Sequence, residues 1–188
     1  MLLRHRAPGI ASQAPTPTTS FKHLDERSVA VLRWLADNRV DFVLVGPVAR
    51  AIRGDAGARG PVSLVPAPYG RNLDRLARAL WSARARLRVD VAPDGSTSGS
   101  DTVPVKMSAE KLVRAQRWTL RCGAHDLDIE GRPPGVPRYQ ELLYEAGRFE
   151  IAAELSVEVA SPEDIEHYEH VRRTGSSPEI RITRAPAD

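Results

Sequence analysis

The organisation of this chain is set by the stretch FVLVGPVA at residues 42–49. Four consecutive apolar residues open it and predict a strand that is buried on both faces, since such strands lack polar alternation. Gly46 ends the apolar run. Pro47 suits the first turn of a helix, where its missing N–H is least harmful. We therefore expect a buried strand, a glycine turn and a short helix that ends near Gly54.

Helical and strand patterns alternate on both sides of this stretch. The clearest amphipathic helix is expected at 72–84, where leucines recur on one face. Ser161 and Pro162 form a strong helix start. Other helices are expected at 22–38, 108–115 and 139–146, and strands at 62–65, 87–91, 118–120, 127–129, 149–151 and 157–159. This order predicts an α/β (α+β) fold in which helices flank a mixed sheet.

The two ends of the chain differ in composition from its centre. Residues 1–20 contain proline, serine and threonine without an apolar period, which predicts a disordered leader. Residues 173–188 hold few large apolar residues and predict an irregular tail, with one late strand as an option. We expect one domain at 21–172, interrupted by a polar loop at 93–104.

Composition narrows the class of protein. The chain has 188 residues, of which 41% are hydrophobic, enough for a substantial core. Its single cysteine, Cys122, excludes an internal disulfide framework. No apolar run approaches the length of a membrane span, and no secretory signal is indicated, so a cytoplasmic location without membrane contact is expected. The net charge is +3, and the basic residues are interspersed with acidic ones along the chain. This distribution does not favour nucleic-acid binding.

Several segments together resemble a known family over most of residues 25–171. They are the stretch 42–49 with Gly54 and Arg59, the strand ending Leu64-Val65-Pro66, the triplet Leu127-Asp128-Ile129, Gly135-Val136, Tyr139, and residues 157–164. In order and spacing they resemble the small nucleotidyltransferases, including those that act as toxins in bacterial toxin–antitoxin and abortive-infection systems. The resemblance implies a nucleotidyltransferase-like sheet and a phosphate site beside the glycine turn.

The resemblance also implies a site for two-metal phosphoryl transfer, which this sequence alters. The family places two acids one residue apart on the second strand and a third acid on a neighbouring strand, and together they hold magnesium. The matching positions are Pro61, Ser63 and Asp128. Proline offers no ligand and serine is a poor one for magnesium. In the glycine turn, Pro47 also removes an N–H that would face a phosphate.

We therefore expect a catalytically degenerate protein that acts by binding a protein partner or a phosphate-bearing, nucleotide-like ligand, without a cofactor. The expected ligand-binding residues are Gly46, Arg50, Arg53, Arg59, Ser63 and Asp128, and Asp128 is the residual candidate for metal binding. Asp126 and Glu130 alternate with Leu127 and Ile129 and are expected on the solvated face of the strand.

Two alternatives stay open. The first is an active magnesium-dependent nucleotidyltransferase that binds a nucleoside triphosphate through a rearranged set of acids, such as Asp55, Asp126 and Asp128. The second is a nucleic-acid-binding module that uses arginines to contact phosphates. The three tryptophans fall on apolar faces and are expected in the core or at an interface, not as platforms for bases: Trp34, Trp81 and Trp118.

Overall fold

The computed structural model describes residues 9–10, 15–89, 102–114, 117–131 and 134–175. Its helices are η1 (a 3-10 turn, Thr19–Phe21), α1 (Glu26–Asp37), α2 (Gly46–Ile52), α3 (Gly70–Ser82), α4 (Ala109–Arg114), α5 (Tyr139–Glu145) and α6 (Pro162–Thr174). Its strands are β1 (Phe42–Val45), β2 (Val62–Pro66), β3 (Arg86–Arg88), β4 (Thr102–Pro104), β5 (Arg117–Cys122), β6 (His125–Glu130), β7 (Gly147–Ala152) and β8 (Leu155–Val159). The expected mixed α/β class is confirmed.

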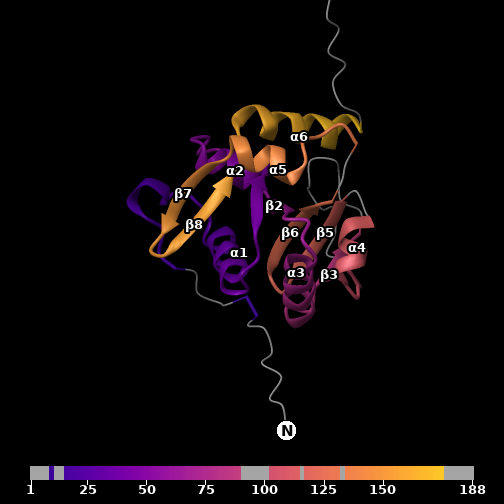
Figure 1. The fold of residues 1–188 in the computed structure, drawn as a ribbon. Helices are drawn as coiled ribbons and strands as arrows, with labels where there is room; N and C mark the ends of the chain where they lie inside the picture. Colours follow the sequence, from indigo (N-terminus) through magenta and orange to yellow (C-terminus); the bar gives the residue numbers. More distant parts are fainter. Residues whose placement is uncertain (1–8, 11–14, 90–101, 115–116, 132–133, 176–188) are drawn as a thin grey trace, which may run out of the picture.

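All eight strands form one mixed sheet in the order β4-β3-β5-β6-β2-β1-β8-β7. Strands β1 and β2 pair antiparallel, while β6 lies parallel to β2 on one side of this pair and β8 lies parallel to β1 on the other. In Figure 1 the β7–β8 pair lies at one end of the molecule and β3 and β5 lie towards the other, with β2 between them. β1 and β2 are buried along their whole length, as the apolar run predicted for β1.

Helices α2, α5 and α6 group together at the top of the view in Figure 1, whereas α1 and α3 lie below them. Helix α2 contacts β2 and α6, and α1 packs across β2, β6 and β8. Pro47 lies in the first turn of α2, as expected. Helix α6 begins with the predicted cap: the Ser161 Oγ accepts the Asp164 backbone N–H at 3.1 Å.

Some boundaries differ from the sequence predictions. Residues 102–104 form the edge strand β4 instead of ending a loop, because their backbone pairs with β3. The rest of that predicted loop lies outside the described residues, as does the optional strand of the C-terminal tail. Within the segment expected as a leader, Pro17 bridges Ala152, and the Thr18 N–H donates to the Ile151 carbonyl at 2.9 Å. Helix α6 continues to Thr174.

In the parts of the chain that the structure describes, none of the helices combines the length and apolar character needed to cross a membrane.

Candidate functional site

Ser63 and Asp128 lie side by side at the centre of the sheet. The parallel pairing of β2 with β6 aligns them in register, and the antiparallel pairing of β1 with β2 aligns Val45 with Ser63. Residues aligned in this way point to the same face of a sheet. Ser63 and Asp128 are both buried. The structure thus brings together two of the positions that the sequence singled out.

Gly46, the first residue of α2, packs against Ser63. Its φ of +70° lies in the left-handed region, which favours glycine. A Cβ atom built on Gly46 would come within 2.9 Å of both the Cβ and the Oγ of Ser63. The Ser63 Oγ is itself buried, with no hydrogen-bond partner among the described residues. Backbone of the glycine turn therefore packs directly onto Ser63 and leaves no room for a larger side chain at Gly46.

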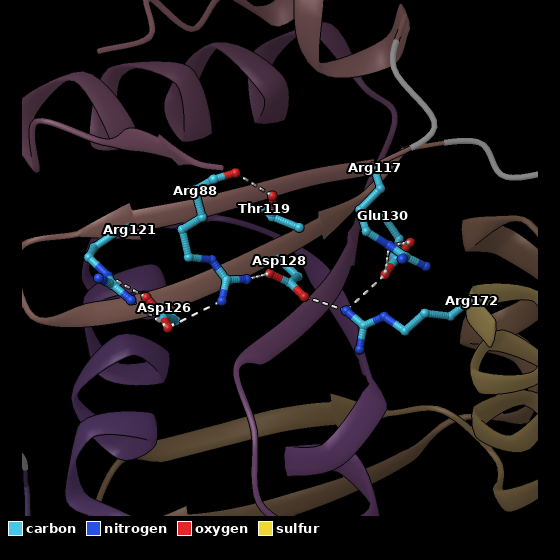
Figure 2. Close-up of polar contacts among 8 residues, drawn as sticks. All are labelled: Arg88, Arg117, Thr119, Arg121, Asp126, Asp128, Glu130 and Arg172. Carbon is cyan, nitrogen blue, oxygen red and sulfur yellow. Dashed lines mark hydrogen bonds and ion pairs between the residues drawn. The ribbon is translucent and has the colours of Figure 1, made fainter. Parts of the chain in front are cut away.

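The carboxylate of Asp128 is fully buried and is bound by an arginine on each oxygen. Arg88 of β3 donates from Nη2 to Oδ1, and Arg172 of α6 donates from Nη2 to Oδ2. Both guanidinium groups are themselves almost completely buried. Figure 2 shows them approaching Asp128 from opposite sides, one from the sheet and one from the last helix. Charge-assisted pairs of this kind are the strongest hydrogen bonds that side chains make.

The neighbouring acids of β6 extend these contacts along the strand. The Arg117 Nε donates to both oxygens of Glu130, at 2.8 and 3.0 Å. The Arg121 Nε donates to Asp126 at 2.8 Å. Arg88 also reaches Asp126 at 3.2 Å, and Arg172 lies 3.7 Å from Glu130. We call the whole set the carboxylate–arginine network: Asp126, Asp128, Glu130, Arg88, Arg117, Arg121 and Arg172 (Figure 2).

The network carries one more positive than negative charge, since four guanidinium groups face three carboxylates. Burial raises the pKa of the Asp128 carboxyl, and the guanidinium groups of Arg172 and Arg88 oppose that rise. Burial likewise raises the pKa of Glu130, against the pull of Arg117. For both Asp128 and Glu130, hydrogen-bond contact with arginine therefore offsets part of the cost of burying a carboxylate.

This arrangement corrects one prediction. Asp126 and Glu130 do share a face with Asp128, but that face is not solvated: Glu130 is only 2% exposed and Asp126 is half-buried between two arginines. Alternation along β6 placed the acids correctly on one side. It did not show that β5, β3 and α6 would cover that side with arginines.

The three arginines predicted near the glycine turn donate hydrogen bonds to other groups of the protein. Arg50 pairs with Asp55 at 2.7 Å and Glu169 at 3.0 Å. Arg53 donates to the carbonyls of Val159 and Ala160, and its guanidinium stacks over Phe149 at 5.1 Å from the ring centroid. Arg59 donates to the carbonyls of Ala56 and Ala58. None of these contacts joins them to the carboxylate–arginine network.

A magnesium site does not fit these residues. Pro61 has no side-chain ligand, Ser63 is neutral, and both oxygens of Asp128 already accept from arginine. Asp55, one of the acids in the enzyme alternative, pairs with Arg50 and accepts the Gly57 N–H. Within the described ranges no group of three or more His, Cys, Asp and Glu side chains is arranged to hold a metal ion.

Sequence reasoning missed four arginines of the network. Two of them had a local signal: residues 117 and 121 both lie on the strand before the hairpin turn, and with period-2 alternation they fall opposite Glu130 and Asp126. Complementary charges across a hairpin are therefore predictable. Arg88 and Arg172 had no such signal, because the first comes from a short strand and the second from a helix 44 residues after Asp128.

Comparison with known proteins finds no family model that matches this chain, and no curated protein matches it. The fold and the site define it as a mixed α/β protein with an eight-stranded sheet and a buried carboxylate–arginine network.

Proposed function

We propose that this chain is a catalytically degenerate protein of nucleotidyltransferase-like fold that acts by binding and not by nucleotide transfer. The order of β1, the glycine turn, α2 and β2, with β6 parallel to β2, supports this relationship. So does the alignment of Ser63 with Asp128, which are two of the three positions where the resemblance implies metal ligands. One observation carries the proposal: two buried arginines occupy both oxygens of Asp128.

The electrostatics explain why binding of magnesium is not expected. A magnesium ion needs several oxygen ligands at short range and keeps most of its water. In this protein the one remaining acid is buried and surrounded by a net positive charge. For magnesium to bind, the guanidinium groups of Arg88 and Arg172 would have to leave Asp128. The divalent cation would then lie near the other arginines of the network, whose positive charge repels it. The arginines thus replace the metal as the positive partner of Asp128.

The ligand is a protein partner or a phosphate-bearing molecule, and its site is expected away from the glycine turn. Arg50, Arg53 and Arg59 all have partners within the chain, so a phosphate there would compete with contacts that these guanidinium groups already make. In addition, Pro47 has no N–H to donate, and Gly46 is packed against Ser63. The turn therefore has a structural role in this proposal.

Calorimetry and a transfer assay test the proposal. The protein is titrated with ATP, CTP, GTP and UTP, each with and without magnesium, and is then incubated with labelled nucleotides and cell extract. We expect neither magnesium-dependent binding nor transfer of label. Magnesium-dependent turnover that Asp128→Asn abolishes, while Arg173→Gln leaves it intact, would establish the enzyme alternative instead. Circular dichroism of both variants shows that each is folded.

A further inference from the structure

The side chain of Trp81 projects from the last turn of α3 and is 63% exposed. Of the two expected positions, core or interface, the core is therefore wrong for Trp81, whereas it is confirmed for Trp34, which is 2% exposed. A large aromatic ring left open to solvent loses the stabilisation that its burial would provide. Exposed aromatic residues of this kind often serve in recognition, where the ring stacks on a partner.

Two adjoining hollows flank Trp81. One, of about 640 Å³, lies between α3 and residues 106–109; the other, of about 600 Å³, lies between the end of α3, β3 and residues 104–106. Both are lined by Trp81 and Lys106. We call this region the Trp81 surface, and its charged residues are Arg71, Asp74, Arg75, Arg78, Arg84, Arg86 and Lys106.

The Trp81 surface is much more basic than the chain as a whole. It holds six cations and one acid, whereas the full sequence has 27 basic and 24 acidic residues. Four of these cations, Arg71, Arg78, Arg84 and Lys106, are exposed, and among the described residues their side chains form no hydrogen bond or ion pair. This contrasts with the arginines of the glycine turn and of the network, which all have partners inside the protein.

The basic residues are spaced along a rigid element. Arg71, Arg78 and Trp81 lie at positions i, i+7 and i+10 of α3, on its exposed side. At a rise of 1.5 Å per residue, they extend over about 15 Å. Arg84 continues the row just beyond the helix. A row of guanidinium groups without partners among the described residues, with an open aromatic ring between Arg78 and Arg84, matches a chain of phosphates with an unstacked base.

We propose that the Trp81 surface binds single-stranded nucleic acid, with phosphates on Arg71, Arg78 and Arg84 and a base stacked on Trp81. Arginine donates to phosphate oxygens in a planar fork, and aromatic stacking accepts any base. A single strand fits better than a duplex, because bases within a duplex are already stacked on one another. This site is separate from Asp128, so the inference stands whether or not that position is catalytically degenerate.

Fluorescence anisotropy of labelled oligo(rU) and oligo(dT), measured over a series of salt concentrations, tests the proposal. Trp81→Ala should weaken binding about tenfold, in line with the loss of one stacked base, while Trp81→Phe should retain most of the affinity. Arg78→Gln and Arg84→Gln should each lower the slope of log affinity against log salt by about 0.7. Because all of these side chains are exposed, the variants should fold normally, which thermal melting verifies.

Arg173→Gln is the matched control on α6, and Arg148→Gln, whose side chain pairs with Glu158 at 3.4 Å, is a second exposed-charge control on β7. We expect binding to stay within roughly twofold of the parent, because screening limits the effect of distant charges. Absence of binding at low salt would overturn the proposal, as would an equal loss in the controls. Binding of anionic vesicles or polyglutamate that depends on Trp81, without binding of oligonucleotides, would identify a different partner and also overturn it.

Discussion

Arg172, near the end of α6, donates to Asp128 at the centre of the sheet, 44 residues earlier in the chain. The contact joins the last helix of the described fold to its innermost carboxylate. It also places a positive group where the resemblance implies a metal ion. A single long-range pair thus links the stability of the fold to the proposed loss of catalysis.

Removing one partner of a buried ion pair leaves the other without compensation. We expect Arg172→Gln to lower the free energy of unfolding by about 3 kcal/mol. The adjacent Arg173→Gln should change it by less than about 0.5 kcal/mol, because that side chain is exposed. Urea denaturation measures both. If the two variants unfold at the same urea concentration, the Arg172–Asp128 pair does not stabilise the helix on the sheet.

Ser63 provides a second test, since its buried hydroxyl has no hydrogen-bond partner among the described residues. Ser63→Ala should be neutral or stabilising by up to about 1 kcal/mol, because no hydrogen bond is lost. Ser63→Asp should destabilise by about 3 kcal/mol or more, since it buries a second carboxylate beside Asp128. Denaturant unfolding of the two variants gives the comparison. A destabilising Ser63→Ala would show that the hydroxyl does have a partner.

Gly46 combines a left-handed backbone with close packing, and the two effects can be separated. Gly123 has a similar φ of +65°, but a Cβ atom there would meet nothing within 4 Å. Gly123→Ala should cost about 1–2 kcal/mol for the backbone alone. Gly46→Ala should cost about 1–3 kcal/mol more, owing to the contact with Ser63. Equal costs in thermal unfolding would mean that the turn can move away from Ser63.

Cys122 should make the fold sensitive to alkali. Burial, with a contribution from Asp126, raises the pKa of its thiol from 9.0 to about 12. Between these values the unfolded chain loses the thiol proton while the folded chain keeps it. The free energy of unfolding should therefore fall by about 1.4 kcal/mol for each pH unit above 9, and below pH 9 this contribution is fully retained.

The measurement is urea unfolding as a function of pH, with Cys122→Ala as the reference for all other titrating groups. The parent should lose stability more steeply than the variant between pH 9 and pH 12. In addition, the folded parent should react slowly with a thiol reagent below pH 9, because the thiol is buried and protonated. Parallel pH curves for the two proteins would contradict the prediction.

Local patterns determined most of the fold. The apolar run of β1, the Gly46–Pro47 turn, the amphipathic α3 and the Ser161 cap of α6 all depend on residues that are close in sequence, so their physical causes can be seen there. The alternation of acids along β6 is equally local. The sequence therefore determined most of the elements, although not the edge strand β4, and it determined which side of β6 carries the carboxylates.

Only the tertiary structure decided what those carboxylates contact. Crossing connections in the sheet bring β3 near Asp128, and α6 returns to it from the far end of the domain. Likewise, the end of α3 leaves Trp81 exposed beside Lys106, although its helical periodicity suited the core. Burial and ion pairing depend on which elements pack against one another, and these elements are often distant in sequence.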